Sequence, residues 1–359
     1  NPAIADVRGV NFRNIIINGD MSIAQRGTSA TGLGNGDNGY HTCDRWSFRE
    51  SGSPTWEFTM SQDTDVPTGQ GFAKSLKMDC TTADASLATN DMCRIQQSFE
   101  GQNLQYLKFG TSSAQSTTIS FWVKSNKTGN YNVSLLNNDQ SRIIGNTYTI
   151  SSADTWEKKT ITFAGDTAGA FDNDNNNSLS LWWGLLGGTD RVGGDSSSWG
   201  ANADNKNVAG QTVNLADSTS NEWYLTGVQF EAGSQASDFE FLPFDVNLQR
   251  CLRYFQDMAP KKNDCRIAIG ENVSGQRCDP VLQYVEKRAN PSVTFTAANT
   301  FSLYNANTSR DCTSMSADNF SEICGNLNAN VSSGLTPTGG ASQFITNGTG
   351  SQIFVDAEL

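Results

Sequence analysis

Short segments in which apolar and polar residues alternate follow one another along most of the chain. In residues 118–124 the apolar side chains are Ile119, Phe121 and Val123, and Ser120, Trp122 and Lys124 occupy the positions between and after them. Successive side chains of a β-strand point to opposite faces, so this pattern predicts a strand with one buried face. The same alternation predicts strands at residues 131–135, 146–150, 160–163 and 179–185.

Segments rich in Gly, Asn, Asp and Ser separate these strands and predict loops at residues 32–39, 172–177 and 187–211. Many short strands divided by turn-forming residues are typical of a β-sandwich. Residues 223–231 also have the composition of a strand. Strict alternation places its apolar residues on both faces, so the sequence leaves the buried face of this strand open.

One helix is predicted after these strands. Its apolar residues recur at helical spacing, and they are Leu248, Cys251, Leu252 and Phe255. Asp245 or Asn247 can cap its start, and Pro260 ends it. Strand patterns resume beyond it at residues 266–270, 281–287, 292–296, 301–304 and 343–357.

The chain is therefore expected to be all-β, with a β-sandwich followed by a smaller C-terminal β domain and a short helix joining them. The expected bounds are an N-terminal arm at residues 1–13, the first domain at 14–245, the connecting helix at 246–260 and the C-terminal domain at 261–359.

The balance of charges narrows the function. The 359 residues include 25 Lys and Arg against 37 Asp and Glu, a net charge of -12. Such a chain is a poor partner for nucleic-acid phosphates or anionic membrane surfaces, which basic patches recognise. No run of about 20 apolar residues is present, so we expect no membrane insertion. His41 is the single histidine, which excludes a multi-histidine metal site.

A series of short motifs resembles a known family. The motifs stand at residues 14–21 (NIIINGDM), 44–46 (DRW), 100–104 (EGQNL), 120–125 (SFWVKS), 226–233 (TGVQFEAG), 251–255 (CLRYF) and 285–291 (VEKRANP). In this order they resemble tail-fibre and related virion structural proteins of tailed bacteriophages. The first domain is also similar to jelly-roll carbohydrate-binding modules, although Met21 departs from the Phe common at that position.

The resemblance implies a jelly-roll-like first domain and a virion component without enzymatic activity. The expected function is that of a tail-fibre or receptor-binding protein that adsorbs to a host surface polysaccharide or lipopolysaccharide. A homotrimer at the virion surface, in contact with other virion proteins, is the expected assembly. The alternatives are a purely structural head decoration or connector protein and a polysaccharide depolymerase.

Glycan-binding modules offer aromatic rings as flat platforms for sugars. Trp122 and Trp182 lie opposite the apolar positions of their predicted strands, and Trp199 lies in a loop rich in Ser and Gly. These three residues are the candidate glycan-binding residues. The other five tryptophans, Trp46, Trp56, Trp156, Trp183 and Trp223, are assigned to the core or to an interface.

The cysteines form three local couples that could close hairpin-sized loops: Cys80 with Cys93, Cys265 with Cys278, and Cys312 with Cys324. The alternative is that they are reduced and pack as small apolar residues. We expect no cofactor. Asp172, Asp174 and Asn176 resemble the start of a calcium loop, but the sixth and twelfth positions exclude an EF-hand, which leaves a looser structural calcium site as an alternative.

Overall fold

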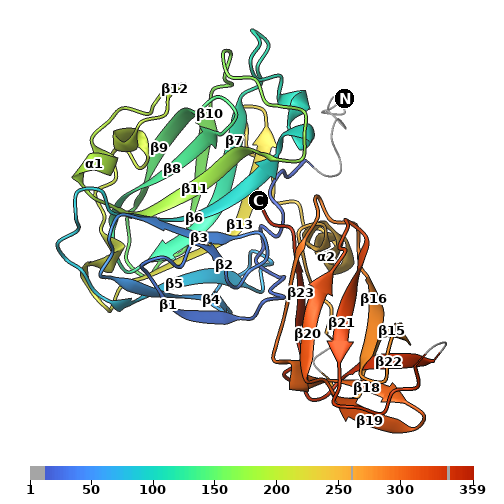
Figure 1. Cartoon of the computed structure of the whole chain (residues 1–359). Coiled ribbons are helices and arrows are strands. Elements are labelled where there is room, and N and C mark those ends of the chain that lie inside the picture. The colour runs from blue at the N-terminus through green and yellow to red at the C-terminus, as the bar shows by residue number, and fades with distance from the viewer. Residues whose placement is uncertain (1–12, 260–261, 338–339) are drawn as a thin grey trace. The chain divides into compact units, whose positions relative to one another are not determined.

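The computed structural model describes residues 13–259, 262–337 and 340–359, and the chain divides into two units (Figure 1). Unit 1 comprises residues 1–248 together with Leu359, and unit 2 comprises residues 249–358. Of the N-terminal arm expected at residues 1–13, only Arg13 lies within the described residues. Both units are built almost entirely from antiparallel strands, which confirms the all-β prediction.

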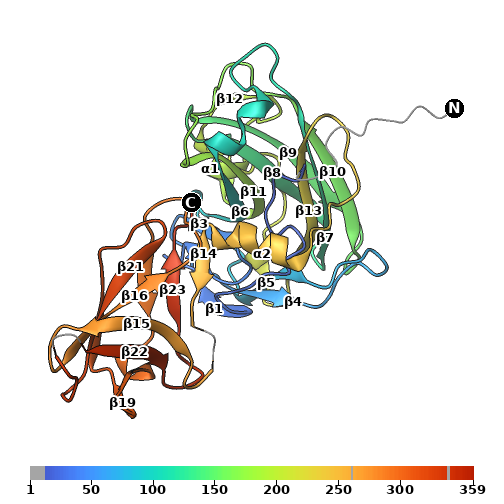
Figure 2. The ribbon, with the colours of Figure 1, turned by 90° about the vertical axis from the view of Figure 1, so that its right-hand side faces the viewer.

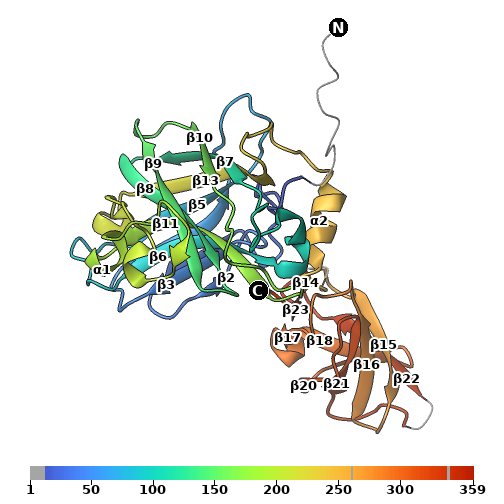
Figure 3. The ribbon, with the colours of Figure 1, turned by 90° about the horizontal axis from the view of Figure 1, so that it is seen from above.

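Unit 1 is a sandwich of two sheets, which Figure 3 shows as two layers. The six-stranded sheet has the order β1 (Ser29–Leu33), β4 (Glu57–Asp63), β5 (Ser75–Thr82), β13 (Glu222–Ala232), β7 (Thr117–Ser125) and β10 (Glu157–Phe163). The seven-stranded sheet has the order β12 (Gly200–Ala201), β9 (Arg142–Ile150), β8 (Gly129–Asn137), β11 (Asn177–Gly187), β6 (Met92–Glu100), β3 (Ser47–Ser51) and β2 (Gly39–Tyr40). Neighbouring strands in space are often distant in sequence, as in a jelly roll.

A single apolar core lies between the two sheets. Ile119, Phe121 and Val123 are fully buried in it, as alternation predicts for β7. Four of the five tryptophans assigned to the core or to an interface are also fully buried there: Trp46, Trp56, Trp183 and Trp223. The fold is therefore a jelly-roll-like β-sandwich, held together by burial of the inward-facing residues of both sheets.

A bulge in β13 resolves the ambiguous pattern of that strand. Its register against β7 shifts between Thr226 and Gln229, and Gly227 there has a φ of 61°. The extra residue turns the second half of the strand over, so apolar residues from both halves reach the same core. These are Trp223, Leu225, Val228 and Phe230, all fully buried.

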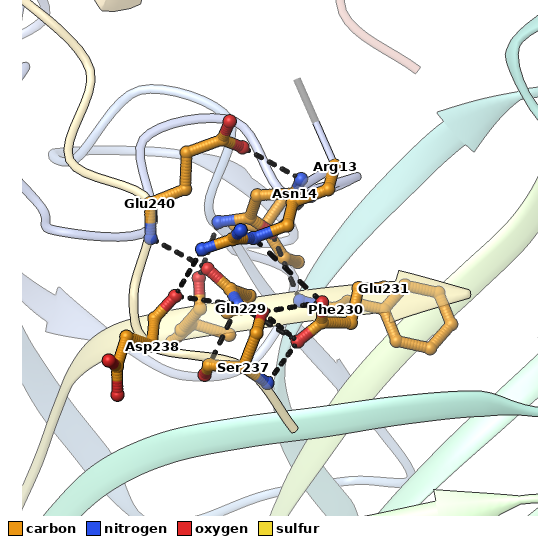
Figure 4. A network of polar contacts seen from close by, with 10 residues as sticks. Arg13, Asn14, Gln229, Phe230, Glu231, Ser237, Asp238 and Glu240 are labelled. Carbon is orange, nitrogen blue, oxygen red and sulfur yellow. Dashed lines mark hydrogen bonds and ion pairs between the residues drawn. The ribbon is translucent and has the colours of Figure 1, made fainter. Parts of the chain in front are cut away.

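The first described residues bind directly to this bulged strand (Figure 4). The side chain of Asn14 donates to the Val228 carbonyl at 3.1 Å and accepts from the Phe230 amide at 3.0 Å. The Ile15 amide donates to the Phe230 carbonyl, and the Val228 amide donates to the Gly19 carbonyl. Two motifs of the family resemblance, at residues 14–21 and 226–233, are thus partners in space.

Polar side chains around this contact extend it into a network (Figure 4). Gln229 donates to Glu231 at 2.9 Å and accepts from the Glu240 amide at 2.7 Å. Arg13 donates to the Asp238 carbonyl at 2.8 Å, and its Nε lies 3.9 Å from Glu231. The network fixes both the start of the described chain and the segment that leaves β13.

Unit 2 contains two smaller sheets. The larger has the order β19 (Thr308–Asp311), β18 (Phe301–Asn305), β22 (Ala341–Thr346), β15 (Arg266–Asn272), β16 (Arg277–Gln283), β21 (Cys324–Asn330) and β20 (Ser314–Asp318). Figure 2 shows β22, β15, β16 and β21 of this sheet. The smaller has the order β14 (Phe255–Asp257), β23 (Ile353–Asp356) and β17 (Ser292–Phe295).

The predicted helix is shorter than its pattern suggests. Helix α2 spans Phe244–Leu252, and Phe255 starts strand β14, which pairs with β23. The ring of Phe255 packs 5.2 Å from that of Phe354, so burial in unit 2 decides its conformation. The remaining helices are α1 (Thr189–Val192) and the 3₁₀ turns Gly101–Asn103, Gln105–Leu107, Asp204–Lys206, Leu215–Asp217 and Ala298–Thr300. No helix among the described residues is long and apolar enough to span a membrane.

Strand register contradicts two of the predicted cysteine couples. In the β15–β16 hairpin, Cys278 pairs beside the turn with Asn272, whereas Cys265 precedes the opposite end of the seven-residue β15. At 3.3 Å per residue this separation is about 20 Å, far beyond the roughly 6 Å that a disulfide spans between Cα atoms. Cys312 and Cys324 are held apart in the same way by β21.

The third couple, Cys80 and Cys93, lies in the core but forms no disulfide. Cys80 on β5 and Cys93 on β6 belong to opposite sheets of unit 1, and both are buried. Burial raises the pKa of the Cys80 thiol to about 11 and holds that of the Cys93 thiol well above its usual value. All eight cysteines are free thiols in the structure, and burial keeps most of them unreactive.

Substituting Gly19 with alanine tests the contact between residues 14–19 and β13. A Cβ there would stand 2.2 Å from the Val228 carbonyl oxygen, and backbone cannot move aside as a side chain can. Overpacking of this kind costs about 1–3 kcal/mol of stability. We therefore expect the midpoint temperature of thermal unfolding of unit 1 to fall by roughly 2–10 °C. All eight tryptophans lie in unit 1, so their fluorescence follows this unit alone.

Gly193→Ala is the matched control, because its Cβ would meet nothing closer than 3.7 Å. Equal midpoints for the two variants would contradict the proposed role of the contact.

Thiol labelling tests the state of the cysteines. Alkylation in denaturant without a reductant is expected to add eight labels per chain, counted by mass spectrometry. A preparation that takes up two fewer labels until it is reduced would contain a disulfide that this structure lacks.

Candidate functional site

The outward face of the six-stranded sheet carries two neighbouring tryptophans. Trp122 on β7 lies opposite Lys158 on β10, and Trp156 stands two residues before Lys158 on the same side. Trp122 and Trp156 are therefore diagonal neighbours, a separation that aromatic side chains can bridge. Both are half-buried, so each ring keeps exposed surface. We call the group of Trp122, Trp156, Lys124 and Tyr224 the β7 face.

Lys124 holds the rings of Tyr224 and Trp156 in place. Its ammonium lies 4.2 Å from the ring centroid of Tyr224 and 5.8 Å from that of Trp156. It also forms an ion pair with Asp65, which accepts from the indole N–H of Trp156 at 2.9 Å. The two rings meet edge-on, 6.1 Å apart. Since Tyr224 and Trp156 each contact a fixed charge, these two rings are ordered before any ligand arrives.

A second ion pair supports the same face. Lys77 lies 3.0 Å from Glu222, and the hydroxyl of Tyr224 donates to Glu222. Partial burial acts to raise the pKa of Glu222, but the bonds from Tyr224 and Lys77 outweigh it and lower that pKa. The pKa of Asp65 is lowered in the same way, against partial burial, by Lys124 and Trp156. Both carboxylates are therefore ionised at neutral pH and can accept hydrogen bonds.

Trp182 does not form an exposed platform. It lies on the outward face of the seven-stranded sheet, but only 3% of it is exposed. Its indole N–H donates to the Asn207 carbonyl at 3.1 Å, and the guanidinium of Arg94 lies 4.4 Å from its ring centroid. The 187–211 segment predicted as a loop folds over this tryptophan, so Trp182 anchors that segment.

Trp199 is also committed to contacts within unit 1. It is half-buried and packs against the core cluster. Its indole N–H donates to the Ala164 carbonyl at 2.6 Å, and its ring meets Phe109 edge-on at 5.7 Å. Among the three candidate tryptophans, Trp122 is the one grouped with other partly exposed aromatic and charged side chains.

The sequence pattern missed Trp156. This residue precedes β10 and was assigned to the core or to an interface, because nothing in its own segment revealed which way it points. The signal that could have found it is the pairing of β10 with β7, which places Trp156 beside Lys124. The two strands are at least 32 residues apart in the sequence, so the residue pattern of neither segment reveals that they pair.

The described residues contain no group of three or more His, Cys, Asp and Glu side chains that could hold a metal ion. In the loop suggested for calcium, Asp174 accepts from the amide and side chain of Asn176, so it caps a turn. His41 lies beside the Asp37 carbonyl, 2.8 Å from its Nε2.

No protein-family model matches the sequence, and no curated protein is significantly similar to it, so the phage resemblance depends on its motifs alone. Similar solved structures exist. One is an enzymatically active domain of tailspike protein 4 from bacteriophage CBA120, with 12% identity and a TM-score of 0.33, where the match covers 61% of this chain and 21% of that one. This chain thus spans about a fifth of the tailspike structure.

Two further similar structures carry names that refer to sugars. A putative sugar binding protein from Bacteroides thetaiotaomicron has 9% identity and a TM-score of 0.33, with 61% of this chain and 99% of that chain covered. A family 11 carbohydrate-binding module from Clostridium thermocellum, solved with a mixed-linked tetrasaccharide, has 10% identity and a TM-score of 0.29, with 58% and 98% covered.

The different surroundings of two tryptophans lead to a stability prediction. Trp182→Ala removes a buried ring and its hydrogen bond, so we expect unit 1 to lose about 3–5 kcal/mol. Trp122→Ala removes a half-buried ring and is expected to cost about 1–2 kcal/mol. Urea unfolding followed by the fluorescence of the remaining tryptophans measures both. A larger loss for Trp122→Ala would show that Trp122 is a core residue.

Proposed function

We propose that unit 1 binds a polysaccharide through the β7 face. The observation that carries this proposal is that two partly exposed tryptophans, Trp122 and Trp156, are diagonal neighbours among ionised groups. Aromatic rings pack against the apolar faces of sugar rings, while neighbouring charged and hydroxyl groups bond to sugar hydroxyls. The β7 face supplies both kinds of contact.

The preordered state of Trp156 favours binding. Its ring is already held by Lys124 and Asp65, so it loses little side-chain freedom when a ligand docks. The nearby ionised groups, Lys77 and Glu222, offer a donor and an acceptor for hydroxyls. Two neighbouring rings on one face can stack against successive sugars of a chain, which favours a polysaccharide over a single small molecule.

The motifs that resemble tail-fibre proteins support a more specific proposal. In it, the chain is a non-enzymatic virion component that adsorbs a tailed bacteriophage to a host surface glycan. A homotrimer would present three copies of the face, and linked copies raise the avidity of a weak site by about 10²–10⁴. A head decoration or connector protein would instead bind no host glycan, and a depolymerase would cleave one.

Binding to host glycans tests the proposed function. We expect Trp122→Ala and Trp156→Ala each to weaken binding to extracted host polysaccharide or lipopolysaccharide by about tenfold or more, because each removes a stacking surface. Tyr106→Ala is the matched control, since this ring is 51% exposed on a different part of unit 1. Light scattering verifies the assembly of each variant and is expected to give three times the 38.8 kDa chain mass.

Unchanged binding by both tryptophan variants would move the site away from the β7 face. No binding of the correctly assembled wild type to any host glycan would favour the structural role. Release of shorter saccharides by the wild type would favour the depolymerase.

A further inference from the structure

Two arginines lie directly opposite each other on the seven-stranded sheet. Arg49 on β3 pairs with Arg94 on β6, and both are half-buried. Side chains opposed in this way have Cβ atoms about 4.5–5.5 Å apart, and like charges in such positions destabilise a sheet. The chain therefore maintains an unfavourable pair of positive charges on this face.

Neither arginine forms an ion pair with a carboxylate of the described residues. Within the described ranges of the chain, neither Arg49 nor Arg94 has an acidic side chain within 4.0 Å. Other arginines do have such partners: Arg142 lies 2.7 Å from Asp166, and Arg191 lies 2.7 Å from Asp204. The chain has 37 acidic residues against 25 basic ones, so the missing acidic partner of these two arginines does not reflect a shortage of acids in the chain.

The nearest acid in sequence serves another contact. Glu50 follows Arg49 on β3 and therefore points to the opposite side of the strand. Its carboxylate accepts from the Gly36 amide and from the side chain of Asn38, both at 3.0 Å.

The guanidinium of Arg94 is held in place, and several of its N–H donors have no acceptor among the described residues. Its Nε donates to Gln96 at 3.1 Å, one face lies over Trp182, and Nη1 contacts the Met92 sulfur at 3.7 Å. Gln96 in turn donates to Ser98 at 3.0 Å, which fixes its orientation. An arginine has five N–H donors, so Arg94 retains several for a ligand.

The side chain of Arg49 contacts an aromatic ring and lies on the same face as a hydroxyl that is unpaired among the described residues. Its guanidinium lies over the Tyr40 ring, 5.7 Å from the centroid. Ser51, two residues further on the same face, has a hydroxyl without a hydrogen-bond partner in the described chain. Burial together with Arg49 lowers the pKa of Arg94 to about 10, which leaves it charged at neutral pH.

We propose that the opposed pair Arg49 and Arg94 is a binding site for an oxyanion, namely a carboxylate, sulfate or phosphate group, either free or carried by a saccharide. Two guanidinium groups can share the oxygens of such a group and form charge-assisted hydrogen bonds with it. Binding would also remove the repulsion between the two charges. This site lies on the other sheet from the β7 face, and the proposal does not depend on glycan binding there.

Thermal unfolding of unit 1 with inorganic phosphate provides the first test. Phosphate is expected to raise the midpoint of the wild type more than sodium chloride of equal ionic strength, which controls for screening. Arg49→Gln is expected to lose this difference, and Arg49→Lys to keep part of it. Lys108→Gln removes one exposed charge elsewhere on unit 1 and is expected to behave as the wild type.

Without added anion, Arg49→Gln is expected to match or exceed the wild-type midpoint, because it relieves the repulsion. The proposal is overturned if phosphate stabilises the wild type, Arg49→Gln and Lys108→Gln equally. It is equally overturned if Arg49→Gln is less stable than the wild type and phosphate adds nothing to the wild type.

Calorimetric titration distinguishes the sources of the anion. The probes are inorganic phosphate, inorganic sulfate, an oligogalacturonate, a sulfated oligosaccharide and a neutral oligosaccharide. Tighter binding of an acidic oligosaccharide than of the free anions, by about tenfold, assigns the site to a saccharide, and equal affinities assign it to free anions. Arg94→Gln is expected to abolish either, whereas Lys108→Gln leaves both unchanged. Absence of saturable binding of every anionic probe to the wild type would refute the site.

Discussion

The structure of unit 1 depends on the contact between residues 14–19 and the bulge of β13. Asn14 satisfies backbone groups on both sides of Phe230, and Gly19 approaches Val228 more closely than any residue with a Cβ could. Buried backbone groups that lose their partners are costly, so this contact and the bulge must form together. This contact also explains why the motifs at residues 14–21 and 226–233, more than 200 residues apart, occur together in the family resemblance.

The bulge decides which residues of β13 reach the core, whereas the outward side of the strand before it stays regular. It lets Trp223 and Val228 share one core although they belong to opposite faces of an ideal strand. Ahead of the bulge, Tyr224 is left on the outward side, where Lys124 and Glu222 engage it. Tyr224 precedes the register shift, so its outward position does not depend on the bulge.

The two outward faces of the sandwich differ in how their aromatic residues are used. On the seven-stranded sheet, Trp182 is covered by the 187–211 segment and by Arg94, so its ring stabilises the fold. On the six-stranded sheet, Trp122 and Trp156 keep exposed surface. Charges also differ: Lys124 is paired with an acid, whereas Arg49 and Arg94 lie opposite each other and form no ion pair with an acid in the described part of the chain. The second arrangement suits a ligand that brings its own negative charge.

The sequence by itself determined the all-β class, the buried side of strands such as β7, and the outward position of Trp122, because alternation is a local property of the chain. It did not determine the end of α2, where burial of Phe255 in a strand overrides helical spacing. It also could not reveal that Trp182 is covered, that Trp156 joins Trp122, or that two cysteine couples are held apart. Those outcomes depend on strand pairing and loop packing between distant segments, which only the tertiary structure decides.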